Sequence, residues 1–229
     1  MEEPLSKRWI WSVTLLALAL CLGTLPALAQ QTFFTDLGPM GNEYQGGTGW
    51  TVSGTGTVGT SFTAANLFTS LASGSVSQID LAVGYVAGDN AFYAAIFTDN
   101  SGLPGTQLWR EDNLSSSQSF GGCCGLVTVT GISGLSLAAG QQYFVVLGPE
   151  TLNSTVWEAF NWNNQGVNGL DLYSEDGGNT WNSNGTGNPL GAFDILGSTG
   201  SSVPEPSSMI LLGTGLVGAF GTMRKKLMR

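Results

Sequence analysis

Two neighbouring cysteines, Cys123 and Cys124, are the side chains of this sequence best suited to covalent chemistry. They lie in the glycine-rich stretch 121–125, and the third cysteine, Cys21, lies in an apolar N-terminal segment. Consecutive Cα atoms are about 3.8 Å apart, whereas disulfides usually begin near about 4.4 Å, so a bond between neighbours is strained. Oxidation after export gives a vicinal disulfide or an intermolecular bridge. We predict the vicinal disulfide, and two free thiols are the alternative.

Carboxylates are frequent between residues 150 and 176, where a pair of acids could support glycosidase chemistry. The candidates are Glu150, Glu158, Asp171, Glu175 and Asp176. A hydrolase needs a defined gap between two carboxyl groups, which spacing in the sequence does not provide, and solvated loop carboxylates are the commoner explanation. The oxygen-rich loops 99–100 and 171–176 are candidate calcium sites, but neither has EF-hand spacing. We therefore assign no catalytic residue, no metal ligand and no cofactor.

Aromatic and amide side chains gather between residues 157 and 182 in a mixture that suits sugar rings. Trp157, Trp162 and Trp181, with Tyr173, are interspersed with the asparagines at 161, 163, 164, 168 and 182. Aromatic rings stack on sugars, and loops of a β-sandwich commonly carry such sites. Core packing of Trp157 and Trp181 is the commoner explanation of the same residues. The three tryptophans are the candidate glycan contacts.

Residues 174–181 fit the Asp-box pattern Ser-x-Asp-x-Gly-x-Thr-Trp. In this pattern the Asp176 carboxylate accepts backbone N–H bonds across a hairpin, a glycine takes a positive φ, and Trp181 packs beneath. The pattern occurs once, without the arginine cluster that a sialidase needs. It predicts a structural hairpin and not a catalytic site.

The overall composition narrows the chemistry further. The 229 residues include 34 glycines and no histidine, which excludes Ser-His and Cys-His catalytic pairs and imidazole-bound metals. The hydrophobic fraction of 42% is ample for a core, and the length suits one β-sandwich or two small domains. We expect a folded protein without enzymatic activity.

Charge divides the chain into two ends and a middle. The net charge is −9, yet six of the seven cations lie near the ends and only Arg110 lies between them. Residues 30–203 hold 13 acidic side chains and one basic one. Binding to phosphate requires clustered Lys and Arg, so this balance excludes nucleic acid as a partner and disfavours anionic lipid.

The N-terminal residues 1–29 have the pattern of a secretory signal peptide. Lys7 and Arg8 precede an uncharged, mostly apolar run, residues 9–25, and small residues Ala27 and Ala29 follow it. We predict cleavage by signal peptidase after Ala29. An uncleaved membrane anchor is the alternative, and a lipoprotein site at Cys21 is disfavoured by the bulky leucine before it.

The C-terminal residues 201–229 combine a proline-rich motif, an apolar segment and a basic end. The motif at 203–208 begins with Val203, Pro204, Glu205 and Pro206, and the apolar residues 209–223 predict a membrane helix. With fewer than about 20 apolar residues and four glycines, this helix is a marginal permanent anchor. The basic end 224–229 predicts a stop-transfer signal on the cytoplasmic side. Its cations are Arg224, Lys225, Lys226 and Arg229.

Residues 203–229 resemble the PEP-CTERM protein-sorting tail, a family of exosortase substrates, in the order and spacing of these three parts. The resemblance implies recognition of Pro204, Glu205 and Pro206 by exosortase, insertion of the precursor into the inner membrane, and sorting to the surface of a Gram-negative bacterium that makes exopolysaccharide and biofilm matrix. The same type of tail has been labelled a C-terminal domain of ice-binding proteins. An ordinary tail anchor is the alternative, although such anchors do not require Pro-Glu-Pro.

Alternation of apolar and polar side chains predicts the elements that hold the middle of the chain together. No helical period is sustained there, and short β-branched and aromatic runs recur between turn-forming residues. Strands are predicted at 32–37, 49–52, 75–86, 91–98, 106–109, 126–129, 142–147, 155–160, 169–173 and 192–196. They predict an all-β fold, in which residues 30–200 form a single jelly-roll-like β-sandwich flanked by the signal peptide and the transmembrane sorting helix.

Stretches 91–109, 135–147 and 173–181 resemble β-sandwich domains of the choice-of-anchor type, which accompany several bacterial surface-sorting tails. No common activity is established for these domains, so the resemblance implies fold and location alone.

The predicted function is that of an exported surface or extracellular-matrix protein whose middle domain has an unknown binding activity. A module that binds carbohydrate, such as exopolysaccharide, is the main alternative. Ice binding and a secreted hydrolase are less favoured. Ice binding requires a flat, repeated threonine array. The sequence offers one local run without a repeated coil, Thr51, Thr55, Thr57, Thr60 and Thr63.

Overall fold

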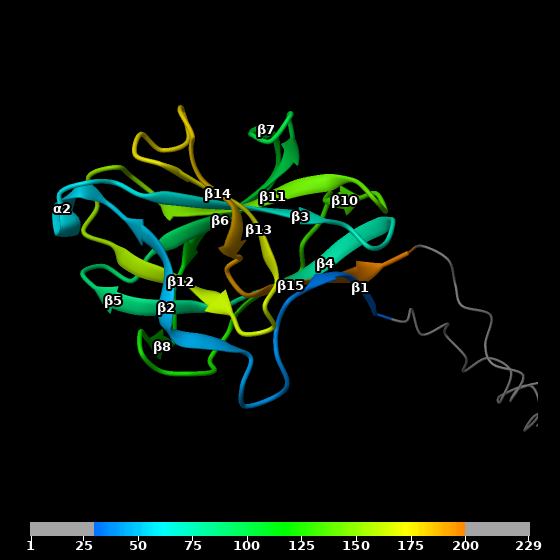
Figure 1. Cartoon of the computed structure of the whole chain (residues 1–229), viewed down its shortest axis with the longest axis horizontal. Coiled ribbons are helices and arrows are strands. Elements are labelled where there is room, and N and C mark those ends of the chain that lie inside the picture. Colours follow the sequence, from blue (N-terminus) through cyan, green and yellow to red (C-terminus); the bar gives the residue numbers. More distant parts are fainter. Residues whose placement is uncertain (1–29, 200–229) are drawn as a thin grey trace, which may run out of the picture. The chain divides into compact units, whose positions relative to one another are not determined.

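The computed structural model describes residues 30–199 (Figure 1). Several sequence predictions lie outside the described residues. These are the signal peptide 1–29 with Ala27 and Ala29, the sorting motif 203–208, the membrane helix 209–223 and the basic end 224–229. Between residues 30 and 199, no helix has both the length and the apolar character needed to cross a bilayer.

Strands make up nearly all regular structure in the described part of the chain, which confirms the prediction of an all-β sandwich. The exception is a single helical turn, α2 (Thr55–Val58), which ends at Gly59 in the left-handed conformation with φ of 80°. A positive φ at that position favours glycine.

The largest sheet has six antiparallel strands. Their order is β14 (Asn182–Pro189), β13 (Asn168–Ser174), β3 (Thr63–Thr69), β11 (Gln142–Pro149), β6 (Phe92–Asp99) and β7 (Pro104–Leu114). Strands β14 and β7 are its two edges.

Two smaller sheets form the other side of the sandwich, below the six-stranded sheet in the view of Figure 1. One has the order β1 (Gln31–Thr35), β15 (Phe193–Ser198), β4 (Gly74–Leu81) and β10 (Ser136–Leu137), with β9 (Val127–Thr130) also paired to β4. The other has the order β2 (Tyr44–Ser53), β12 (Trp157–Asn163), β5 (Val83–Ala87) and β8 (Gln118–Ser119).

Ala82 joins the two smaller sheets. Its N–H donates to the carbonyl of Ala192 at 3.0 Å, and its carbonyl accepts the N–H of Asn161 at 2.8 Å. The run predicted as one strand, 75–86, is therefore divided here into β4 and β5. The division allows one apolar run to pair with β15 in the first sheet and with β12 in the second.

The main core lies between the two sides of the sandwich and receives alternate side chains from all three sheets. The alternating apolar residues Val76, Ile79, Leu81 and Val83 are buried in it, as are Phe92, Ala94 and Ile96 of the next run. Tyr85, which continues the first alternation, is half-buried and lies outside this core. Aromatic rings pack at its centre, where the ring centroids of Phe68 and Phe193 are 5.5 Å apart. The intervening side chains of β6, Tyr93 and Ala95, are buried on the outer face of the sheet, so this strand has two buried faces and not one.

Two main strands, β3 and β14, are missing from the sequence prediction. Strand β3 reads Thr-Ala-Ala-Asn-Leu-Phe-Thr and is buried on both faces, so it shows no alternation of apolar and polar residues. Strand β14 is an edge strand without an apolar residue before its final proline. Both segments become strands because they pair with neighbouring strands, although their sequences lack the alternation of apolar and polar residues that predicts a strand.

Candidate functional site

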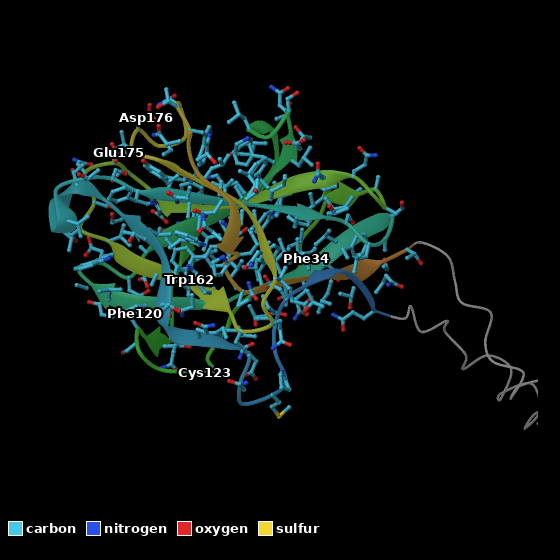
Figure 2. All side chains as sticks on the ribbon, in the orientation of Figure 1. Phe34, Phe120, Cys123, Trp162, Glu175 and Asp176 are labelled. Carbon is cyan, nitrogen blue, oxygen red and sulfur yellow. A yellow bond between two sulfur atoms is a disulfide. The ribbon has the colours of Figure 1, made fainter. Side chains whose placement is uncertain are left out.

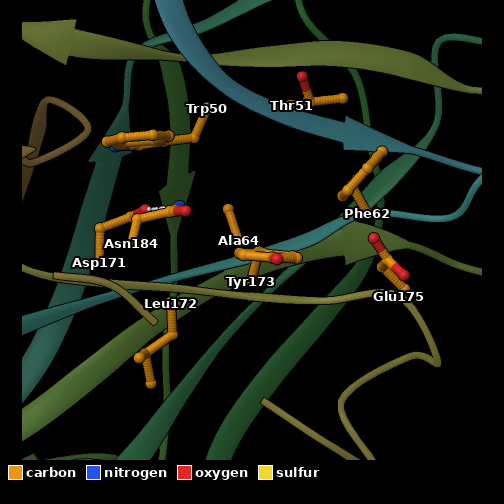
Figure 3. Close-up of a pocket in the computed structure, with 9 residues that line it drawn as sticks. All are labelled: Trp50, Thr51, Phe62, Ala64, Asp171, Leu172, Tyr173, Glu175 and Asn184. Carbon is orange, nitrogen blue, oxygen red and sulfur yellow. Dashed lines mark hydrogen bonds between the residues drawn. The ribbon is translucent and has the colours of Figure 1, made fainter. Parts of the chain in front are cut away.

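A pocket of about 330 Å³ lies on one open side of the sandwich, where edge strand β2 faces strands β3, β13 and β14 (Figure 3). Its walls combine aromatic rings with carboxyl and amide groups. The lining residues are Trp50, Thr51, Phe62, Ala64, Asp171, Leu172, Tyr173, Glu175 and Asn184. Asp171, Tyr173 and Glu175 are spaced by two along β13 and its continuation, so the period of a strand directs them to one face.

Asp171 is the central polar group of the pocket and is only 1% exposed. Asn66 donates to its Oδ1 and Asn184 donates to its Oδ2, each at 2.5 Å. Asn66 is itself oriented, because its Oδ1 accepts the N–H of Gly191 at 2.6 Å. Burial raises the pKa of Asp171 to about 7, although the hydrogen bonds from Asn184 and Asn66 lower it. The pocket therefore holds a fixed carboxyl group that changes its charge near neutral pH.

Three aromatic rings, those of Trp50, Phe62 and Tyr173, surround the space beside this carboxyl group (Figure 3). The Trp50 Nε1–H donates to the carbonyl of Pro189 at 2.9 Å, which ties β2 to the end of β14. Phe62 and Tyr173 have ring centroids 6.1 Å apart. Glu175 is exposed and lies on the other side of the view from Asp171. The rings offer apolar platforms, and the polar groups offer hydrogen-bond partners beside them.

The three tryptophans predicted to contact glycans do not line this pocket. Trp162 lies next to it, with its ring 5.2 Å from that of Trp50. Trp157 is partly exposed at the start of β12, and Trp181 packs against the cluster on the outer face of the six-stranded sheet. Glycan contact by these three residues stays a prediction. The structure brings together Trp50, Phe62 and Tyr173 instead, of which the sequence pattern singled out only Tyr173.

The carboxylates named from the sequence occupy different surroundings. Asp171 and Glu175 share the pocket, whereas Glu150 accepts a hydrogen bond from the backbone of Asn113. Glu158 is fully buried, and neither of its carboxyl oxygens has a hydrogen-bond partner among residues 30–199. Burial raises the pKa of Glu158 to about 8. This side chain belongs to the interior of the sandwich and not to a surface site.

The threonines considered for ice binding do not share one strand. Thr51 is on β2, Thr55 and Thr57 are on α2, and Thr63 is fully buried on β3. These residues therefore do not form the flat, regular array that the hypothesis requires.

The Asp-box hairpin has the geometry that its sequence predicts, and Figure 2 shows Asp176 at the tip of its loop. Asp176 accepts the backbone N–H of Thr180 at 2.8 Å on Oδ1 and the Thr180 hydroxyl at 2.6 Å on Oδ2. Gly177 and Gly178 have φ of 72° and 91°, and Trp181 lies beneath Gly178. Hydrogen bonds from the Thr180 side chain and backbone, and from Ser174, lower the pKa of Asp176 to about 2.

We expect Asp176→Ala to lower the thermal unfolding midpoint at pH 7. The substitution removes the acceptor of both Thr180 hydrogen bonds. Because the pKa is lowered on folding, the stabilisation by ionised Asp176 is present above about pH 4 and is lost as the pH falls through about 2. Thermal melts of the wild type and the variant at pH 7 and pH 2 measure this, and Glu175→Gln is the control. An equal midpoint for Asp176→Ala and wild type at pH 7 would contradict the structural role.

Cys123 and Cys124 are joined by a disulfide bond in the structure. Their loop lies against the start of β2, where the Gly121 N–H donates to the carbonyl of Gly46 at 2.6 Å. The Tyr44 hydroxyl donates to the carbonyl of Gly125 at 3.0 Å. In the view of Figure 2, Cys123 lies on the opposite side of the domain from Asp176 and Glu175.

Comparison with known proteins places a recognised motif at the C-terminal end. Residues 202–225 match the family of the PEP-CTERM protein-sorting motif, which confirms the predicted motif. No curated protein matches the chain.

The solved structures to which this chain is similar include that of the cysteine protease and lectin-like domains of Cwp84, a surface layer associated protein of Clostridium difficile. That chain has 17% sequence identity and a TM-score of 0.41, and the match covers 60% of this chain and 32% of that chain. This chain thus spans about a third of the length of that protein.

The matched sorting motif marks the present chain as an exported protein that an exosortase sorts to the cell surface.

Proposed function

We propose that residues 30–200 form a non-enzymatic carbohydrate-binding module that the sorting motif delivers to the cell surface. The observation that carries this proposal is the pocket in which the rings of Trp50, Phe62 and Tyr173 surround a space beside the buried carboxyl group of Asp171. Signal peptidase removes residues 1–29 during export, and exosortase processes the tail. The proposed partner is a surface or matrix polysaccharide.

A sugar ring has apolar C–H faces and a rim of hydroxyl groups, and the pocket has complementary features of both kinds. Aromatic rings contribute buried apolar area, while fixed polar groups give orientation and specificity. Asp171 and Glu175 accept hydrogen bonds from hydroxyl groups, and the pocket volume of about 330 Å³ lies at the small end of ligand sites. A single sugar unit or a short stretch of a chain is therefore the ligand size that fits.

The negative charge of the domain indicates which class of polysaccharide it can bind. The exported domain carries 13 acidic side chains and one basic one, and two of the acids line the pocket itself. Uronate-rich or sulfated polymers are repelled by such a surface, because like charges without counterions disfavour association. We therefore propose a neutral polysaccharide as the ligand.

The positions of the pocket carboxyls favour binding over hydrolysis. Both oxygens of Asp171 already accept a hydrogen bond from an asparagine amide, and these amides hold the carboxyl group in one orientation. This arrangement suits a group that binds hydroxyls better than a nucleophile that must form a covalent bond. A secreted hydrolase, with Asp171 and Glu175 as its acids, is the second candidate because a carboxyl group with a pKa near 7 is also suited to acid catalysis.

We expect the full-length chain, purified in detergent, to be retarded in affinity electrophoresis through a gel that contains a neutral polysaccharide. Tyr173→Ala should weaken retardation about tenfold or more, since removal of an aromatic contact at the centre of a site costs about 2 kcal/mol. Phe120→Ala, which removes an exposed aromatic ring outside the pocket, is the matched control and should behave as wild type.

Three outcomes would count against this proposal. Equal retardation of Tyr173→Ala and wild type would remove the pocket from the binding site. If no neutral polysaccharide retards the chain, the proposal of a neutral ligand is wrong, whether or not the chain binds an acidic polysaccharide. Release of reducing sugar that Asp171→Asn abolishes would establish the hydrolase instead.

A further inference from the structure

Three potential metal ligands meet where the Cys123–Cys124 loop touches the start of β2. One carboxyl oxygen of Glu43 and the sulfur atoms of Cys123 and Cys124 all lie within 4.8 Å of one another. The residues come from segments about 80 positions apart in the sequence, and the fold brings them together. Between residues 30 and 199 this is the one group of three such ligands, and neither 99–100 nor 171–176 forms another.

The surroundings of these ligands are those of a built site. The Glu43 N–H donates to Cys124 Sγ at 3.3 Å, and a donor of this kind stabilises a thiolate. Glu43 Oε1 accepts the N–H of Gly41 at 3.0 Å, which orients the carboxylate as outer hydrogen bonds orient metal ligands. Glu43 Oε2 is buried and has no hydrogen-bond partner among residues 30–199. The carboxylate thus has one oxygen that is oriented and one that is available to a ligand.

We propose that, with both cysteines reduced, Glu43, Cys123 and Cys124 bind one soft or borderline divalent cation of the zinc type. Two thiolates and one carboxylate match the preference of Zn²⁺ and Cd²⁺, and three protein ligands leave a fourth tetrahedral position for water. The strongly acidic domain attracts a cation to this loop. Hydrogen bonds hold the loop at both ends, from the Gly121 N–H to the Gly46 carbonyl and from the Tyr44 hydroxyl to the Gly125 carbonyl, so the loop backbone stays beside Glu43 when the disulfide is reduced.

The disulfide and the metal site exclude each other, because a sulfur in a disulfide has no thiolate lone pair of comparable donor strength. The chain leaves the reducing cytoplasm with both thiols intact. Exchange with an oxidised protein disulfide then forms the Cys123–Cys124 bond, transfers two electrons and two protons to that partner as two thiols, and releases any bound cation. Metal binding and oxidation therefore compete for the same pair of sulfur atoms.

The test uses the full-length chain with Cys21→Ser, in detergent, reduced with a phosphine and titrated with Cd²⁺. We expect a sulfur-to-metal charge-transfer absorption that saturates at one equivalent, and no such band for the oxidised chain. Glu43→Gln, which retains an oxygen for the Gly41 N–H, should keep the band but weaken affinity for Zn²⁺ about tenfold or more in competition with a chromophoric chelator. Glu111→Gln, an exposed carboxylate on β7, is the matched control.

The titrations either support or overturn the proposed metal site. Saturation at one equivalent, with weakened binding in Glu43→Gln, supports the three-ligand site. Absence of a charge-transfer band in the reduced chain overturns it, provided that circular dichroism shows the wild-type fold. Unchanged zinc affinity in Glu43→Gln also overturns it, since the carboxylate would then be no ligand.

Discussion

The domain is expected to lose stability as the pH rises from 5 to 8, with a fall in the thermal midpoint of about 5 °C or more. Burial raises the pKa of Glu158 from 4.5 to about 8 and that of Asp36 from 3.8 to about 8. Asp171 and Asp194 are shifted in the same direction, to about 7 and about 6. The folded state then holds protons that the unfolded chain has released, which destabilises it progressively between about pH 4 and pH 8.

The sign follows from the direction of the shifts. Below the unfolded pKa of about 4, both states are protonated and these groups impose no penalty. Above it, each raised group destabilises the folded state further as the pH rises, until its folded pKa is reached. Asp176 acts in the opposite direction, but only between about pH 2 and pH 4. The stability maximum should therefore lie near pH 4, which is more acidic than usual.

Glu158→Gln isolates one of the two groups whose pKa burial raises to about 8. The wild-type side chain is 0% exposed, with no hydrogen-bond partner for either carboxyl oxygen among the described residues. A neutral amide of the same size removes the cost of a buried negative charge at high pH. We expect the variant to be more stable than wild type at pH 8 and to have a flatter pH profile, while the two differ little at pH 5.

Thermal melts or denaturant titrations at half-unit steps from pH 4 to pH 9 measure both effects, and Glu111→Gln on exposed strand β7 serves as the control. A wild-type midpoint that rises from pH 5 to pH 8 would contradict the first expectation. The same pH slope in Glu158→Gln and wild type would show that Glu158 does not contribute to it.

Replacing both Pro204 and Pro206 by alanine is expected to abolish most sorting to the cell surface. These residues lie within the matched motif 202–225, and the prolines restrict the backbone at the site that an exosortase must recognise. We expect the apolar segment that follows to enter the membrane in the variant as well, so the unprocessed precursor should accumulate there. Immunoblots of membrane, surface and medium fractions, with protease treatment of intact cells, measure the distribution.

Ser207→Ala with Ser208→Ala is the matched control, because it changes the same short segment and leaves the prolines intact. Normal processing of the double-proline variant would contradict recognition through Pro-Glu-Pro. Loss of the precursor itself would be detected in the same blots, and a Glu205→Gln variant, which retains both prolines, then tests the motif without altering the backbone.

Local sequence was sufficient for much of the fold. The alternation in β4 and β5 identified side chains that face the main core, since a strand directs successive side chains to opposite sides. Strand β6 differs because both of its faces are buried, so the prediction of a single buried face was wrong there. The Asp-box hairpin was also predictable, because its hydrogen bonds join residues no more than four positions apart. The C-terminal motif was recognisable for the same reason, as its prolines, apolar run and cations are contiguous.

The sequence did not reveal strand β3 or the pocket. Strand β3 is central and buried on both faces, so small residues and Asn66 replace the usual alternation. The pocket depends on its register, in which Asp171 pairs with Asn66 and Tyr173 pairs with Ala64. Trp50 reaches the same space from β2, more than 100 positions earlier. The spacing of these residues in the sequence does not predict that they line one pocket.

By itself, therefore, the sequence determined what depends on neighbours along the chain: the C-terminal sorting motif, the all-β class, the hairpin at Asp176 and the adjacent cysteines. Only the tertiary structure decided which side chains meet across strands. It placed Asp171 between Asn66 and Asn184, Glu43 beside the cysteine pair, and Glu158 inside the core. The physical reason is that strand pairing brings distant residues within hydrogen-bonding distance, and the pairing register is set by packing of the whole sandwich.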